Sequence, residues 1–313
     1  MKSRLLGAVC VFIYAILSSG QVISATINFS TLDFPGATGT QARGINNAGQ
    51  VVGFYYDASG EQHGFLKDSS GYTTIDYPGA VTVNLYGINN NGQILGVYST
   101  GDNTIHGFIK SGSSYTTFDH PDTDPSLWSP YGINDAGDVV GYYTNPSELG
   151  GHGFLRTATG YETIDPIGSL STSAIGINNA GMIVGNYASN IYGTRGYMKG
   201  ENGFQPLSVP GNFDTIATGI NNNGLVVGQY RDIIWYGFVW DGVDYTTFNV
   251  PEGSQSTVPW GINDYGEIAG FYVDAAGVNH GFIASIVPIP PALYLFASGL
   301  IGLVGVARRR AQS

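Results

Sequence analysis

Short runs of β-forming residues alternate with polar turns along residues 26–286 of this chain. The runs are rich in Val, Ile, Tyr, Phe and Thr, whereas the turns are rich in Gly, Asn, Asp and Ser. No window in this region has the 3.6-residue period of an amphipathic helix. In the first complete unit, the pattern predicts strands over residues 40–46, 50–56, 63–67 and 72–76.

The same unit recurs along the chain, marked by the phrase Gly-Ile-Asn before a polar turn. The phrase occurs six times at intervals of 42 to 45 residues, with first glycines at Gly44, Gly87, Gly132, Gly176, Gly219 and Gly261. A nearly constant period of this length indicates one supersecondary unit copied in series. Four antiparallel strands per unit are typical of a β-propeller blade.

The two ends of the repeat region are out of phase with each other. Residues 27–36 match the fourth strand of a unit, and residues 280–286 match a third strand. We therefore predict an all-β, six-bladed β-propeller of four-stranded antiparallel blades, in which the N-terminal strand (26–36) completes the last blade beside 280–286. A solenoid or an open array is the alternative, and it leaves the last unit incomplete.

Residues 1–25 have the features of a secretory signal peptide. Lys2 and Arg4 precede an apolar core over residues 5–17, and small residues follow. Cys10, the only cysteine, lies in this core. The predicted mature chain therefore has no cysteine, and no disulfide contributes to its stability.

The C-terminal residues 287–313 contain a second targeting pattern. Val287, Pro288 and Pro290 precede an apolar helical run over 292–307, and Arg308, Arg309 and Arg310 follow it. The order of motif, helix and basic tail resembles the PEP-CTERM sorting signal in its Val-Pro-x-Pro variant, with Ile289 at the position of Glu. The resemblance implies an exosortase-type processing protease, transient inner-membrane anchoring, and delivery to the surface or exterior of a Gram-negative bacterium. A simple membrane anchor with positive-inside arginines is the alternative.

The repeat at 26–286 itself resembles the HAF family of bacterial extracellular repeats. The shared phrases lie at residues 44–53 (Gly-Ile-Asn-Asn-Ala-Gly-Gln-Val-Val-Gly) and 63–66 (His-Gly-Phe-Leu), with Gly in the middle of the namesake His-Ala-Phe. The resemblance implies an extracellular location and no particular chemistry.

The charge of the chain argues against several classes of partner. The formal net charge is −11, and removal of both basic ends leaves a still more acidic body. An acidic surface repels phosphate backbones and anionic lipids, so no nucleic-acid partner is expected.

The sequence predicts no catalytic, cofactor or metal site. His63, His106, His152 and His280 occupy one position in different units, so they are not expected to converge on one ion. Arg195 and Tyr236 replace this histidine, with no matching change expected nearby. The acidic loop around His120 (Asp119, Asp122, Asp124) and the Asn-rich turns suit solvated loops and asparagine turns better than calcium sites. The parts of a nucleophilic enzyme are missing. A glycosidase needs a paired-carboxylate site, but most acidic residues fall at repeated strand ends, where a turn-forming role suffices: Asp33, Asp76, Asp119 and Asp165.

Aromatic residues in the variable connections form the predicted ligand face: Tyr86, Trp128, Tyr131, Tyr192 and Trp260. Alternatively, Trp128 and Trp260 fill the ring near its axis. The leading hypothesis is a noncatalytic, secreted or surface-displayed propeller that binds or builds the extracellular polysaccharide matrix or acts in adhesion. The alternative is a secreted carbohydrate-active hydrolase or lyase, and a third hypothesis is a coat component without a ligand.

Overall fold

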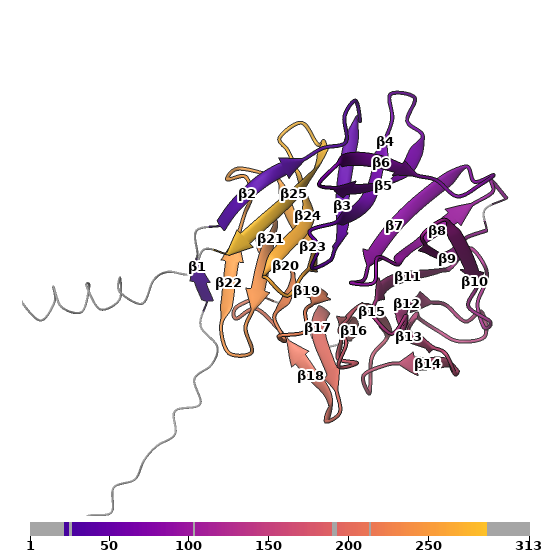
Figure 1. Cartoon of the computed structure of the whole chain (residues 1–313). Coiled ribbons are helices and arrows are strands. Elements are labelled where there is room, and N and C mark those ends of the chain that lie inside the picture. The colour runs from indigo at the N-terminus through magenta and orange to yellow at the C-terminus, as the bar shows by residue number, and fades with distance from the viewer. Residues whose placement is uncertain (1–21, 25–26, 103, 190–192, 213, 287–313) are drawn as a thin grey trace, which may run out of the picture.

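The computed structural model describes residues 22–24, 27–102, 104–189, 193–212 and 214–286 (Figure 1). Regular structure in these ranges is entirely β, and they contain no helix able to cross a membrane. The predicted sorting tail and the predicted signal segment, apart from residues 22–24, lie outside the described residues.

Four separate sheets in the described ranges each consist of four antiparallel strands in chain order. The first contains β3 (Gly39–Ile45), β4 (Val51–Tyr56), β5 (Gln62–Asp68) and β6 (Gly71–Ile75). The second contains β7 (Thr82–Ile88), β8 (Ile94–Ser99), β9 (His106–Ser111) and β10 (Ser114–Phe118). The third contains β11 (Trp128–Ile133), β12 (Val139–Tyr143), β13 (His152–Thr157) and β14 (Gly160–Ile164). The fourth contains β15 (Ser171–Ile177), β16 (Ile183–Ser189), β17 (Gly193–Gly200) and β18 (Gly203–Leu207).

A nine-stranded sheet contains the remaining described strands. One antiparallel set is β19 (Asp214–Ile220), β20 (Val226–Arg231), β21 (Trp235–Trp240) and β22 (Tyr245–Phe248). The other is β23 (Ser256–Ile262), β24 (Glu267–Val273), β25 (Asn279–Ile286) and β2 (Ile27–Leu32). A single residue pair, Trp235 with Ser256, joins the two sets. The fold is thus a β-propeller of four-stranded blades.

The first and last long strands of the repeat region are neighbours, as the sequence predicted. Strand β2 pairs antiparallel with β25, from Ile27 opposite Ile286 to Leu32 opposite Gly281 (Figure 1). A further short strand, β1 (Val22–Ser24), lies within the predicted signal segment and pairs parallel with the outer strand β22. The N-terminal segment therefore contacts both sets of the nine-stranded sheet.

The hydrophobic core lies between neighbouring blades. The aromatic residue of each His-Gly-Phe phrase or its equivalent is almost completely buried there: Phe65, Phe108, Phe154, Tyr197, Phe238 and Phe282. One cluster joins Leu32 and Ala269 to Ala42, Ile45 and Val51, and so packs the end of the chain against its beginning. A Cβ atom on Gly64 would lie 2.8 Å from Leu85 of the next blade, so this glycine permits close sheet-to-sheet approach.

The Asn-rich turns are closed by the side chains of their own asparagines. Asn46 Oδ1 accepts hydrogen bonds from the backbone N–H groups of Ala48 (3.1 Å) and Gln50 (3.0 Å), and Gly49 has a φ of 72°. The side chain therefore replaces a backbone partner inside the turn.

Candidate functional site

The innermost strand of each four-stranded set contains a β-bulge at the residue before the Gly-Ile-Asn phrase. In β3, for example, the register shifts between Ala42 and Gly44. A bulge redirects the side chain of the extra residue. The six bulge residues line one central cavity, which we call the channel mouth: Arg43, Tyr86, Tyr131, Ile175, Thr218 and Trp260.

Three of the five predicted ligand-face aromatics meet at the channel mouth. Tyr86 contacts Tyr131 edge-on at 5.4 Å between ring centroids, and Tyr131 contacts Trp260 at 6.2 Å. Trp260 also lies against the guanidinium of Arg43, with 3.7 Å between Cζ and the ring centroid. The mouth therefore combines a cation with three aromatic rings, a cation–π arrangement.

Burial controls the protonation of the groups at the channel mouth. Desolvation lowers the pKa of Arg43 to about 10, so the guanidinium is still charged at neutral pH. Desolvation also raises the pKa of Tyr131 to about 12, so its phenol keeps its proton and can donate a hydrogen bond. The cavity volume is about 80 Å³, too little for a sugar ring and enough for a small polar group.

Trp128, another of the predicted ligand-face aromatics, does not belong to this site. The prediction that Trp128 is a ligand-face residue is wrong, because its side chain is 2% exposed and packs at 5.8 Å from Phe118 in the core. Its indole Nε1–H donates to the carbonyl of Ile105 at 3.0 Å, which satisfies its only polar group. Nor does Trp128 line the channel mouth, so of the two tryptophans only Trp260 lies there. Tyr192 lies outside the described residues.

The opposite end of the channel is lined by asparagine and aspartate. The polar mouth contains Asn47, Asn90, Asp135, Asn179, Asn222 and Asp264 around a cavity of about 70 Å³. The two carboxylates already have protein partners: Asp135 Oδ2 accepts from Asn90 and Asn179, and Asp264 Oδ2 accepts from Asn47 and Asn222. Asp135 and Asp264 therefore each join two neighbouring turns through asparagine side chains.

Each of the four repeated histidines pairs with a carboxylate of its own four-stranded set. His63 pairs with Asp76 at 3.0 Å, and His280 pairs with Asp33 at 2.8 Å across the β2–β25 boundary. The same contact joins His106 to Asp119 and His152 to Asp165. We call this contact the His–Asp clip. It supports the prediction of a structural role for the histidines.

Two of the four-stranded sets in the described ranges lack the clip, and in both of them the carboxylate is also replaced. The prediction that Arg195 and Tyr236 occur without a matching change is wrong. In a clip, the aspartate directly follows the residue that pairs with the glycine after the histidine, as Asp76 follows Ile75. The equivalent positions hold Ser208, after Leu207 opposite Gly196, and Asn249, after Phe248 opposite Gly237. Sequence reasoning missed this change because the pairing of a third-strand histidine with the aspartate after the fourth strand was not recognised.

Loss of the clip beside β22 coincides with an open aromatic cavity, the outer groove, of about 450 Å³. Its lining combines apolar, aromatic and polar side chains: Ile27, Phe29, Tyr230, Tyr236, Thr247, Phe248, Asn249, Val250 and Glu252. Tyr236 stacks on Tyr230 at 5.6 Å, as His63 stacks on Tyr55 at 5.4 Å. An uncharged aromatic pair therefore stands where other blades have an ion-paired histidine.

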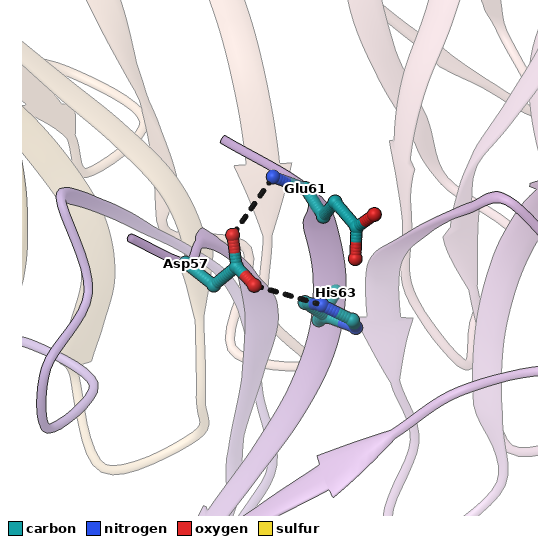
Figure 2. A group of neighbouring side chains, drawn as sticks. All are labelled: Asp57, Glu61 and His63. Carbon is teal, nitrogen blue, oxygen red and sulfur yellow. Dashed lines mark hydrogen bonds and ion pairs between the residues drawn. The ribbon is translucent and has the colours of Figure 1, made fainter. Parts of the chain in front are cut away.

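Within the part of the chain that the structure describes, one group of side chains has metal-ligand spacing. Atoms of Asp57, Glu61 and His63 lie within 4.8 Å of one another (Figure 2). However, Asp57 Oδ1 accepts hydrogen bonds from the backbone N–H groups of Ser59 and Glu61. The pKa of the Asp57 carboxyl is lowered, mainly by the hydrogen bond from the Ser59 hydroxyl and further by these backbone bonds. His63 is also paired with Asp76 through Nδ1. These partners explain the cluster as a turn attached to a His–Asp clip.

The acidic loop around His120 contains a buried aromatic contact. His120 is 6% exposed and stacks on Tyr143 at 3.9 Å. Desolvation lowers its pKa to about 4, so the ring is neutral near pH 7. His120 therefore packs like Phe34, which stacks on Tyr55 at 3.7 Å at the corresponding place.

Comparison with known proteins finds likeness in fold alone. No family model and no curated protein matches this chain. Among solved structures, AofleA from Arthrobotrys oligospora aligns with a TM-score of 0.51 and 11% identity, covering 82% of this chain and 86% of that chain. TolB from Acinetobacter baumannii aligns with a TM-score of 0.50 and 10% identity, covering 80% and 64%. Aleuria aurantia lectin in complex with alpha-methyl-L-fucoside aligns with a TM-score of 0.48 and 13% identity, covering 83% and 97%. This chain is similar to the first two structures in fold.

Proposed function

We propose that this chain is a noncatalytic, exported six-bladed propeller that binds extracellular polysaccharide through its outer groove. The observation that carries the proposal is the replacement of a His–Asp clip by the stacked pair Tyr236 and Tyr230. A carbohydrate-active hydrolase or lyase is the alternative activity, and the experiment below separates the two.

Closure into six blades is supported by a circuit of hydrogen bonds. The buried asparagine of each Gly-Ile-Asn phrase donates from Nδ2 to the backbone carbonyl of the next such asparagine. The circuit runs through Asn46, Asn89, Asn134, Asn178, Asn221 and Asn263 and returns to Asn46. A chain of open units would leave the last donor without this partner.

The outer groove has the composition of a small-ligand site. Phe29, 39% exposed, and the Tyr230–Tyr236 pair present flat apolar surfaces, while Thr247 and the exposed Glu252 supply polar atoms. Asn249 is held in position, because its Oδ1 accepts from Ser254 and Thr257, both at 2.5 Å. A cavity of about 450 Å³ with aromatic walls and a few polar groups suits a sugar, which has apolar ring faces and hydroxyl edges.

The groove can be tested by restoring the clip. The purified protein is screened on a glycan array, and the affinity for the best ligand is measured by calorimetry. The double substitution Tyr236→His with Asn249→Asp should rebuild the ion pair of the other blades and weaken binding at least about tenfold, with the fold retained. The control Tyr265→Ala removes an aromatic residue that is 75% exposed, away from the groove, and should leave the affinity unchanged.

Two outcomes of this experiment contradict the proposal. If the double variant bound the glycan with the affinity of the wild type, the sugar would not bind in the outer groove. Release of sugar from the bound glycan would favour the hydrolase or lyase, so the products are examined by mass spectrometry.

Export to the cell surface is proposed from the resemblance of the two ends to a signal peptide and a PEP-CTERM tag. Intact-mass analysis of the cell-surface product tests this part. A C-terminus between Val287 and Pro291 supports exosortase-type processing, whereas retention of Arg308, Arg309 and Arg310 supports a simple anchor.

A further inference from the structure

Arg43 has an unusual environment for a half-buried cation. Among the described residues no carboxylate forms an ion pair with it, and tyrosines are the groups whose charge acts on its pKa. Nη2 donates to Oε1 of Gln41 at 2.6 Å, and Nε has no hydrogen-bond partner. A guanidinium partly removed from water without a counter-ion is costly, and the contact with Trp260 offsets only part of that cost.

The walls of the cavity add hydrogen-bond donors and no competing anion. The channel mouth is lined by Tyr86, Tyr131 and Thr218 in addition to Arg43, and none of its lining residues is acidic. Both hydroxyls of Thr218 and Tyr131 are protonated at neutral pH, although Thr218 already donates to the carbonyl of Pro259 at 2.8 Å. The positive charge therefore acts on the cavity with little opposition from its immediate surroundings.

We infer that the channel mouth binds a single small carboxylate group, held by the guanidinium of Arg43 and the phenol of Tyr131. The planar guanidinium matches a carboxylate in shape and presents N–H donors in a fork. A cavity that holds one water needs roughly 10–15 Å³ of such space, so the cavity of about 80 Å³ has space for a carboxylate and is too small to enclose a sugar ring. One positive charge in a chain of net charge −11 favours a monoanion over phosphate or sulfate.

This inference is independent of the outer groove, because the two cavities share no lining residue. The carboxylate can belong to a free small acid or to the end of an acidic sugar. Sodium acetate and methyl glucuronide are therefore the two probes, and methyl glucoside is the uncharged control for the second.

The experiment follows tryptophan fluorescence and thermal unfolding of the purified protein during titration with each probe at constant ionic strength. Acetate should give a saturable fluorescence change and raise the Tm, and chloride should do neither. Arg43→Met should weaken acetate binding at least tenfold. Arg43→Lys keeps the charge and loses the fork, so it should bind more weakly than the wild type. The matched control Arg156→Met removes an arginine that lies over Phe118, away from the channel, and should bind acetate normally.

Trp260→Phe should lose the fluorescence change while acetate still raises the Tm, which assigns the signal to the channel mouth. Glucuronide binding with the affinity of acetate, and no glucoside binding, identifies an acidic sugar end as an acceptable source. Binding of acetate alone identifies a free acid. Absence of a saturable acetate effect in the wild type, or acetate binding by Arg43→Met with the affinity of the wild type, would overturn the inference.

Discussion

The side-chain amide of Asn263 donates to the backbone carbonyl of Asn46 at 3.2 Å, although 217 residues separate them in the chain. This hydrogen bond continues the series that links each Gly-Ile-Asn phrase to the next. The ring is therefore joined at its axis by the same contact that joins consecutive units.

Asn263→Ala should destabilise the protein by about 2 to 4 kcal/mol, since a net value of about 1 kcal/mol is typical of one hydrogen bond. The side chain is 3% exposed and makes four contacts: to Asn46, to the Glu267 carboxylate, and to the N–H groups of Tyr265 and Glu267. Urea unfolding provides the measurement. The exposed Asn202→Ala is the control, expected within about 0.5 kcal/mol of the wild type.

Gly132→Ala tests the close approach of the innermost strands. A Cβ atom there would lie 2.6 Å from the carbonyl oxygen of Ile175 in the next blade, so backbone must shift. The expected loss is about 1 to 3 kcal/mol in urea unfolding. Gly200 also lies in a strand, yet a Cβ atom on it would meet nothing within 4 Å, so Gly200→Ala should be neutral or slightly stabilising. Equal effects of the two substitutions would contradict the packing account.

Removal of the N-terminal strand should expose the edge of β25. A protein that begins at residue 37 loses the pairing from Ile27 to Leu32 and the buried side chain of Leu32, which is 2% exposed. We expect a markedly lower Tm and a tendency to associate through the open edge. A synthetic peptide of residues 27–36 should restore the Tm, while a scrambled peptide should not. Unchanged stability of the truncated protein would mean that β2 is dispensable for the propeller.

His280 should make the attachment of β2 to β25 sensitive to pH. Desolvation acts to lower the pKa of His280, but the hydrogen bonds and charges of Asp33 and Asp274 outweigh it, and the folded pKa is raised. A raised folded pKa contributes stability that is present below the unfolded value near 6.5 and is lost as pH rises through the folded value.

The difference in Tm between the wild type and His280→Gln should therefore be larger at pH 5.5 than at pH 8. Comparison of the two proteins at each pH removes the general effect of lowering the negative charge of the chain. A difference that does not change with pH would assign the contact to packing on Tyr272, which lies 5.1 Å from the His280 ring.

Most of the fold could be predicted from local patterns. Asn and Gly turns and β-branched runs act over a few residues, so strands such as Val51–Tyr56 and turns such as Asn46–Gln50 are legible in the chain. The phase difference between residues 27–36 and 280–286 also predicted the pairing of β2 with β25. The candidate sites were less accessible. Tyr86, Tyr131 and Trp260 were selected from their positions in the repeat, but Trp128 has the same type of side chain and lies in the core.

The sequence by itself determined the repeating strands, their turns and the pairing of β2 with β25, because these follow from residue propensity and from the period of the repeat. The tertiary structure alone decided which residues meet across the repeats. Bulges at six positions direct the side chains of Arg43 and its equivalents into one channel. Where a His–Asp pair is lost, Tyr236 and Phe29 line the same open groove. Such contacts depend on the curvature of the ring and on the packing of neighbouring blades, and neither has a local signature in the chain.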